Sequence, residues 1–190
     1  MEESLILASS SPRRRDLLLQ AGIPFEVKVP ETDETCTLPA VEAVVELSRR
    51  KALACAKEYQ GRFVLGADTL VVLDGVKLGK PRDTEDACRM LRLLSGRTHH
   101  VCTGVTVVNP SGDVLSDVDV SEVNFERMEE SEIQAYAACG EPLDKAGAYA
   151  IQGRAALWIS SMKGSPSGVI GLPLDLCRRL LKESGYPLFS

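Results

Sequence analysis

The sequence lacks a long apolar run, a basic leader and any Cys-x-x-Cys pair. Its six cysteines are scattered over 190 residues, the start Met1-Glu2-Glu3-Ser4 is acidic, and Asp68 interrupts the longest apolar stretch, 63–73. These absences argue against a disulfide framework, a signal peptide and a membrane span. We therefore expect a cytoplasmic protein with no membrane partner, whose cysteines are reduced and mostly buried rather than structural or metal-binding.

The chain also has no net positive charge and only two histidines. Its formal net charge of −5 opposes binding to nucleic acid polymers, so any anion site must be a local concentration of arginine and lysine. His99 and His100 are the only histidines, and as strand neighbours they would point to opposite faces, which excludes a shared two-ligand site. No Ser-His-Asp or Cys-His arrangement can be built, so we expect catalysis to depend on carboxylates, a metal and cations.

Strand-like and helix-like patterns alternate along the chain, which predicts an α/β fold with a mixed sheet. The expected strands are 5–8, 25–29, 63–67 and 70–73 around Asp68-Thr69, 76–78 after an Asp74-Gly75 turn, 100–108, 114–125 and a segment near 157–159. The expected helices begin at Pro12 and end at Gly22, follow Pro39, run from Asp83 to Gly96, cover 132–139, and begin at Pro173. With 190 residues and no linker, the chain fits a single domain over 1–190, or one core with two lobes.

The first helix begins with a basic turn. Ser9-Ser10-Ser11-Pro12 supplies a cap and a proline at the first helical position, and Arg13-Arg14-Arg15 follows. A helix start carries partial positive charge, so three arginines there are unfavourable unless an anion offsets them. Free amides, the Ser9 and Ser11 hydroxyls and the arginine side chains suit a polyphosphate. The alternative is a solvated basic cluster neutralised by Asp16 and nearby glutamates.

Asp68 is the strongest candidate for chemistry. A carboxylate inside an apolar segment is costly to bury unless it is paired, hydrogen-bonded or bound to metal, so it is a candidate metal ligand or general base. The alternative is an aspartate that caps neighbouring backbone amides. Glu34 lies in an acidic loop, and Lys51 and Lys80 lie in basic stretches; each alone is equally compatible with a solvated surface.

Taken together, these segments are similar to the Maf family of nucleoside triphosphate pyrophosphatases, first linked to septum formation. The matching stretches occur in family order over nearly the whole chain. They are 7–14, 33–35, 66–72, 79–81, 103–105, 140–149, 151–153 and 171–173.

The resemblance implies a Maf/ITPase-like fold, with two lobes around a cleft and a twisted central sheet flanked by helices. It also implies hydrolysis of a nucleoside triphosphate between the α- and β-phosphates with Mg²⁺, or with Mn²⁺ or Co²⁺, by a homodimer. Asp68 would be the catalytic acidic residue, acting as proton acceptor on water or through the metal, with Glu34 as the second carboxylate and metal ligand. Arg13, Thr69 and Gln152 match positions tied to substrate choice, whereas Glu34, Lys51 and Lys80 match further active-site positions.

Asp68-Thr69 and the stretch 144–153 resemble the branch that acts on dTTP and UTP, plain or modified, rather than the 7-methyl-GTP branch. Gln152 and Thr69 offer an amide and a hydroxyl to the pyrimidine edge. The chain departs from the family pattern in the loop 164–173, where tyrosine is expected instead of Pro166 and asparagine instead of Gly168. The competing functions are a non-catalytic nucleotide-binding regulator of septum formation, and a phosphatase or nucleotidyltransferase.

Overall fold

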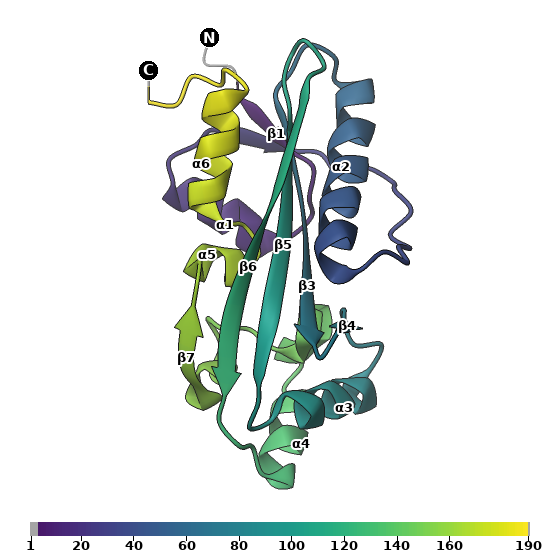
Figure 1. The fold of residues 1–190 in the computed structure, drawn as a ribbon, viewed down its shortest axis with the longest axis vertical. Helices are drawn as coiled ribbons and strands as arrows, with labels where there is room; N and C mark the ends of the chain where they lie inside the picture. The colour runs from purple at the N-terminus through teal and green to yellow at the C-terminus, as the bar shows by residue number, and fades with distance from the viewer. Residues whose placement is uncertain (1–3, 190) are drawn as a thin grey trace.

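The computed structural model describes residues 4–189 and is built around one mixed seven-stranded sheet with the order β2-β1-β3-β5-β6-β7 and β4 paired to β3 (Figure 1). The strands are β1 (Leu5–Leu7), β2 (Phe25–Val27), β3 (Val64–Leu73), β4 (Val76–Leu78), β5 (Thr98–Val108), β6 (Val114–Phe125) and β7 (Ile159–Lys163). β1 is parallel to β2 and β3, and the other pairs are antiparallel. The predicted α/β class and mixed sheet are confirmed.

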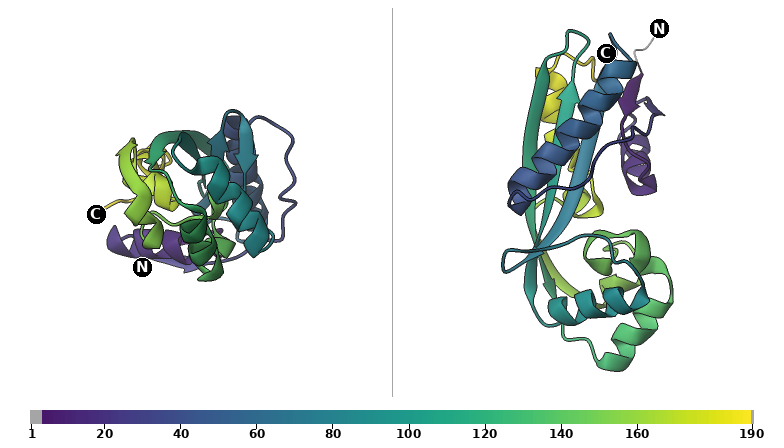
Figure 2. Two further views of the ribbon diagram at one scale, coloured as in Figure 1. Left: turned by 90° about the horizontal axis from the view of Figure 1, so that it is seen from below. Right: turned by 90° about the vertical axis from the view of Figure 1, so that its right-hand side faces the viewer.

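Helices cover both faces of the upper part of the sheet and cluster around its lower end (Figures 1 and 2). The helices are α1 (Pro12–Gln20), α2 (Ala40–Glu58), α3 (Thr84–Leu94), α4 (Glu130–Ala138), α5 (Pro166–Ile170) and α6 (Leu174–Glu183), with 3-10 segments η1 (Glu141–Asp144), η2 (Ala146–Ala148) and η3 (Arg154–Trp158). None of the helices within 4–189 is long and apolar enough to cross a membrane.

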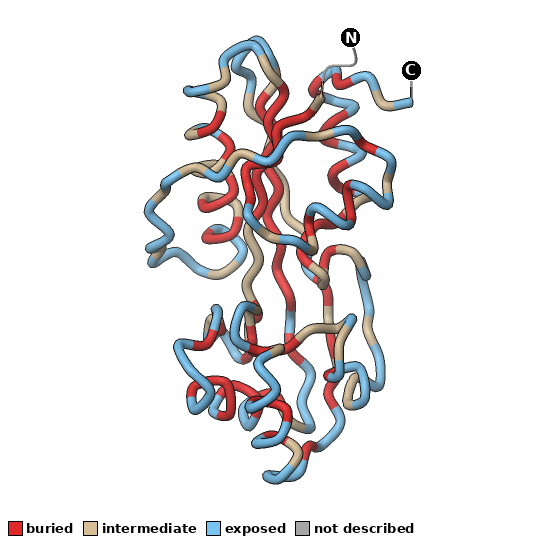
Figure 3. Tube along the Cα trace, turned by 180° about the vertical axis from the view of Figure 1, so that it is seen from behind, coloured by how far each residue is buried: buried red, intermediate tan, exposed pale blue. Residues whose placement is uncertain are grey.

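Alternation along the strands divides the upper core into two layers. Leu5, Leu7 and Leu65 pack with residues of α1 and α6 on one face, whereas Ile6 and Val64 pack with residues of α2 on the other. A separate lower core joins α3, α4 and the 3-10 segments to the far ends of β3, β5 and β6. The buried residues follow these strands along the middle of the molecule (Figure 3).

The long strands β5 and β6 run through both lobes (Figure 1). Between the lobes, the outer edge of β3 has a gap in its pairing. On its outer edge β3 pairs with β1 only at Val64 and Leu65 and with β4 only from Val71 onward. The edge at 66–70 therefore faces no strand within the described residues, and this gap contains Asp68 and Thr69.

Three details differ from the sequence-based predictions. The two strands expected on either side of Asp68 form one continuous strand, because Asp68 and Thr69 pair in register with Gly104 and Thr103 of β5. The last strand begins later than predicted, at Ile159, because 154–158 form a 3-10 segment. The short helix α5 was not predicted, since five residues are too few for a helical period to show.

Other expectations are confirmed. The helix that begins at Pro12 ends before Gly22, whose φ of 67° lies in the left-handed region. All six cysteines are free, and four of them are buried. His99 is fully buried and His100 is exposed, so the two rings do point to opposite faces.

Candidate active site

A cleft of about 1100 Å³ opens along the unpaired edge of β3. The start of α1, the Glu34 loop and Lys51 of α2 line one side of it, and Lys80 and the 144–153 segment line the other. Five cationic and six acidic side chains border it, so the cleft has no net positive charge of its own. Every residue that the sequence singled out as a candidate lines this cleft: Ser9, Ser11, Arg13, Arg14, Glu34, Lys51, Asp68, Thr69, Lys80 and Gln152.

Two carboxylates meet one lysine on the α2 face of the sheet. Lys51 Nζ lies 2.6 Å from Asp68 Oδ1 and 3.0 Å from Glu34 Oε1. The Lys51 and Asp68 side chains are only 13% and 14% exposed, whereas Glu34 is 67% exposed and reaches in from solvent. Hydrogen bonding from Lys51, together with its positive charge, holds the pKa of Glu34 below its ordinary value.

Two glycines allow α2 to lie this close to the sheet. A Cβ at Gly66 would stand 2.4 Å from the Ser48 carbonyl oxygen, and one at Gly104 would stand 2.3 Å from that of Val44. Gly104 is also the cross-strand partner of Asp68. Because no side chain separates the helix from β3 and β5 here, the lysine can reach Asp68 directly.

The Glu34 loop is fixed to α2 by its own turn chemistry. Asp33 Oδ1 accepts hydrogen bonds from the Thr35 amide (2.8 Å) and hydroxyl (2.7 Å). Arg50 Nη1 then donates to the carbonyl oxygens of Asp33 (3.1 Å) and Thr35 (2.9 Å). Asp33 and Arg50 thus hold the backbone on both sides of Glu34, a supporting role that the sequence pattern did not reveal.

Arg14 lies on the opposite face of the sheet and is buried. Its guanidinium donates to Gly171 O (2.8 Å), Ser9 Oγ (3.0 Å) and Thr69 Oγ1 (3.1 Å). Burial lowers the pKa of Arg14, and the negative charge of Asp68 opposes this effect. Three of its donors are therefore already committed to the protein, so Arg14 ties α1 to β3 and to the end of α5 while its charge faces the cleft.

Arg13 bridges the two lobes. Its Nη1 lies 3.3 Å from Asp144 Oδ2, and Asp144 Oδ1 accepts from Lys145 Nζ at 2.6 Å. The positive charges of Lys145 and Arg13 hold the pKa of Asp144 below its ordinary value despite partial burial. Asp144 and Lys145 lie in the matching stretch 144–153, but no sequence signal marked either of them as a site residue. The partner of Arg13 is Asp144, not the nearby Asp16 that the alternative interpretation of the basic turn required.

The segment that carries Gln152 is held in place by hydrogen bonds to Glu141 and Tyr136. Glu141 accepts the Arg154 N–H (3.2 Å to Oε2), and Tyr136 Oη accepts the Ala150 N–H (3.2 Å). A Cβ at Gly153 would lie 1.9 Å from a Glu141 oxygen, so a larger residue there would displace the carboxylate that accepts the Arg154 N–H. The Gln152 side chain is exposed at the cleft.

The loop 164–168 departs from the family pattern, and packing explains the glycine at position 168. A Cβ at Gly168 would stand 2.4 Å from Asp119 Oδ2, so asparagine would fit there only if the Asp119 side chain moved. Pro166 takes the first position of α5, and Ser165 caps this helix by accepting the Gly168 N–H at 3.1 Å. The residues that follow this loop still line the cleft, at Val169, Ile170 and Gly171, and Gly168 O accepts from the buried Thr103 Oγ1 at 2.9 Å.

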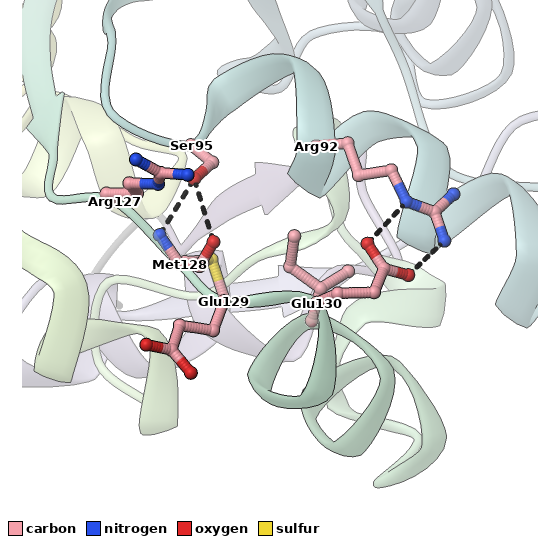
Figure 4. A pocket seen from close by; sticks show the side chains of 7 residues that line it. Arg92, Ser95, Arg127, Met128, Glu129 and Glu130 are labelled. Atoms are coloured by element: carbon pink, nitrogen blue, oxygen red, sulfur yellow. Dashed lines mark hydrogen bonds and ion pairs between the residues drawn. The ribbon is translucent and has the colours of Figure 1, made fainter.

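A second hollow, of about 710 Å³, lies between α3 and α4 (Figure 4). Arg92 forms two hydrogen bonds with Glu130, and the Ser95 hydroxyl forms hydrogen bonds with the backbone N–H and carbonyl of Met128. None of the candidate residues lines it. The chemistry of the molecule is therefore concentrated in the cleft at β3.

No group of three or more His, Cys, Asp or Glu residues within 4–189 is arranged to hold a metal ion. Asp68 and Glu34 nevertheless converge on one position, which Lys51 Nζ occupies. Such a pair suits Mg²⁺, which usually takes one or two carboxylates and completes its coordination with water and substrate phosphates.

Comparisons with known proteins identify the family of the chain. Residues 4–184 match the family model described as Maf-like protein. The chain is 50% identical to a dTTP/UTP pyrophosphatase of Symbiobacterium thermophilum, over 99% of this chain and 97% of that protein. It is 48% identical to a dTTP/UTP pyrophosphatase of Anaeromyxobacter dehalogenans, again over 99% and 97%. A solved HAM1 protein of Coxiella burnetii shares the fold, with a TM-score of 0.52, 16% identity and coverage of 95% and 98%. The chain belongs to the Maf family.

Proposed function

We propose that this protein hydrolyses dTTP and UTP, or modified forms of them, to the nucleoside monophosphate and pyrophosphate. The observation that carries the proposal is the Lys51-centred pair of Asp68 and Glu34, placed in one cleft with the basic start of α1. The two relatives described above, each named dTTP/UTP pyrophosphatase, support the substrate class.

The triphosphate would bind between the two lobes. Arg13, the Ser9 and Ser11 hydroxyls and the free amides of α1 face the cleft, with the charge of Arg14 behind them. Lys51 and Lys80 would contact the phosphates from the sides of α2 and β4. Because a triphosphate carries several negative charges, it would displace Asp144 from Arg13 on binding.

Asp68 would act as the proton acceptor for the attacking water. Its Oδ1 is held by Lys51, which fixes the carboxylate and leaves Oδ2 to accept from a water. That water would attack the α-phosphorus, its proton passing to Asp68, while pyrophosphate leaves with the electrons of the broken P–O bond. Pyrophosphate cleavage needs charge neutralisation and a positioned water more than a protein nucleophile, and the site offers no histidine or cysteine for one.

A divalent cation, Mg²⁺ first and Mn²⁺ or Co²⁺ as alternatives, would be held by Asp68 and Glu34 together with substrate phosphates. When bound, it would offset the phosphate charge that a cleft with no net positive charge cannot offset alone. Thr69 and Gln152 would contact the base. Residence in the cytoplasm, the homodimer, and one domain over 1–190 remain predictions from the sequence and the family.

The test is to incubate the protein and Mg²⁺ with a nucleotide panel and to separate pyrophosphate from orthophosphate. Pyrophosphate from dTTP and UTP is expected; orthophosphate alone would indicate a phosphatase, and binding without turnover would indicate a regulator. Asp68→Asn should abolish turnover and keep the thermal midpoint. Asp117→Asn is the matched control, because Asp117 is also a strand aspartate paired with a cation, Arg179 at 2.6 Å, but lies outside the cleft.

A further inference from the structure

Thr69 belongs to a chain of hydrogen bonds that runs from Arg14 through Thr69 and Thr103 to Gly168. Arg14 Nη2 lies 3.1 Å from Thr69 Oγ1, which lies 3.0 Å from Thr103 Oγ1, which in turn lies 2.9 Å from the carbonyl oxygen of Gly168. Thr103 is fully buried, and it stands directly opposite Thr69 in the β3–β5 pairing. The chain therefore has a charged donor at one end and a carbonyl acceptor at the other.

The two ends determine the direction of every bond between them. A carbonyl oxygen can only accept, so the single Thr103 hydroxyl proton goes to Gly168. Thr103 Oγ1 must then accept from Thr69, which commits the Thr69 hydroxyl proton as well. Because the Arg14 guanidinium has no acceptor, it donates to Thr69 Oγ1 and occupies one of that oxygen's two lone pairs.

One lone pair of Thr69 Oγ1 is left for the cleft, and the backbone leaves room around it. A Cβ at Gly171 would lie 3.6 Å from Thr69 Oγ1, at ordinary contact distance, and the φ of 131° at Gly171 lies in the region that favours glycine. Glycine at this position therefore leaves the side of the hydroxyl next to Gly171 uncovered by a side chain. Thr69 itself is half-buried and lines the cleft.

We propose that Thr103 is a positioning residue that makes Thr69 an obligate hydrogen-bond acceptor, so that the cleft selects a base presenting an N–H group there. This inference rests on the proposed function. Thymine and uracil have a single N–H on their pairing edge, at N3, whereas cytosine presents a bare acceptor nitrogen at the same place. A Thr69 hydroxyl that cannot donate repels that nitrogen, and it equally repels carbonyl and phosphate oxygens.

The test compares pyrophosphate release from dTTP and dCTP by the wild type, Thr103→Val and Thr103→Ser. Valine is close in shape to threonine but frees the Thr69 proton, so Thr69 can rotate and donate to cytosine. We expect the ratio of kcat/KM for dTTP to that for dCTP to fall about tenfold in Thr103→Val, mostly through a better KM for dCTP. Thr103→Ser keeps the hydroxyl and should keep the wild-type ratio.

Thr106→Val is the matched control. Thr106 is also fully buried on β5, and its hydroxyl contacts Ser48 (2.7 Å) and Ser116 (2.9 Å) rather than Thr69. Thr106→Val should lose stability as Thr103→Val does, but it should keep the wild-type ratio of kcat/KM for dTTP to that for dCTP. A Thr103→Val enzyme with a ratio within twofold of wild type would overturn the role of Thr103 while leaving the proposed function standing. A wild type that releases no pyrophosphate from any nucleotide would instead overturn the proposed function.

A second measurement does not depend on whether Thr103→Val folds. The wild type is assayed with N3-methyl-dTTP, which lacks the N3 proton, and with 4-thio-dTTP, which keeps it. We expect kcat/KM to fall at least about tenfold for the first and to change little for the second. Equal turnover of dTTP and N3-methyl-dTTP would refute the accepting role of Thr69.

Discussion

Replacing Gly66 by alanine should separate the two sides of the candidate active site. The added Cβ would lie 2.4 Å from Ser48 O, 2.9 Å from Ala52 N and 3.0 Å from Ala52 Cβ, whereas ordinary contacts begin at 3.4 Å. All three atoms belong to the turn of α2 that carries Lys51, so this turn must retreat by about 1 Å. The 2.6 Å contact between Lys51 and Asp68 would then open.

Two effects of different size follow. Overpacking of this kind costs about 1–3 kcal/mol of unfolding free energy. A displacement of about 1 Å among reacting groups can lower turnover by about 100-fold, which is more than the stability loss alone would cause in a protein that remains folded. The assays are pyrophosphate release from dTTP and the thermal midpoint, measured well below the unfolding transition.

Leu180→Ala is the control for lost stability. Leu180 is 2% exposed in α6 and belongs to the core on the other face of the sheet, so its truncation should cost about 2–5 kcal/mol without moving α2. We expect Leu180→Ala to stay active although its thermal midpoint is lowered. Gly66→Ala should lose turnover even when its thermal midpoint is no lower than that of Leu180→Ala. If both variants lose turnover in proportion to their midpoints, or if Gly66→Ala is fully active, the close approach of α2 does not position Lys51 for catalysis.

Two further predictions concern charges around the cleft. Because Lys51 depresses the pKa of Glu34, their pairing stabilises the protein above the ordinary glutamate pKa of 4.5 and is lost as the pH falls through the depressed folded pKa. Lys51→Met should therefore make the thermal midpoint depend less on pH in the acid range. It should also move the acid limb of the kcat/KM profile to higher pH. Unchanged pH profiles would contradict this role of Lys51. Asp144→Asn should free Arg13 from a partly exposed ion pair and lower the KM for dTTP by about two- to fivefold at low salt, with kcat unchanged. A raised KM would instead mean that Asp144 orients Arg13 for the substrate.

The sequence predicted the elements better than the contacts between them. Local signals such as Pro12 after three serines, or Asp74-Gly75 between two apolar runs, depend only on neighbouring residues and were confirmed. The continuity of β3 through Asp68 could not be predicted, because a polar pair inside an apolar segment resembles a break unless the partner strand is known. The pairing of Asp68 and Thr69 with β5 supplies that information.

The sequence predicted which residues line the cleft, but not the contacts between them. Every candidate residue lines it, and each had been identified from a motif or, as for Lys51, from its match to a family position. The direct partners come from distant parts of the chain: Asp144 lies 131 residues from Arg13, and Gly171 lies 157 residues from Arg14. Periodicity and composition carry no information about such pairs. Thr103 lies in the matching stretch 103–105, but nothing in the sequence indicated its contact with Thr69.

The shared ribbon of β5 and β6 has a consequence for how the molecule can move. Their register is continuous from Thr98 paired with Asn124 to Val108 paired with Val114, across both lobes and past the cleft. Within residues 4–189 the lobes are thus joined by continuously paired strands, which oppose an independent hinge motion of either lobe. A ligand is accommodated more readily by side chains, by the Glu34 loop and the 144–153 segment, or by twisting of the β5–β6 ribbon. The strands therefore set the separation of the two lobes, and the segments that line the cleft adjust to the nucleotide between them.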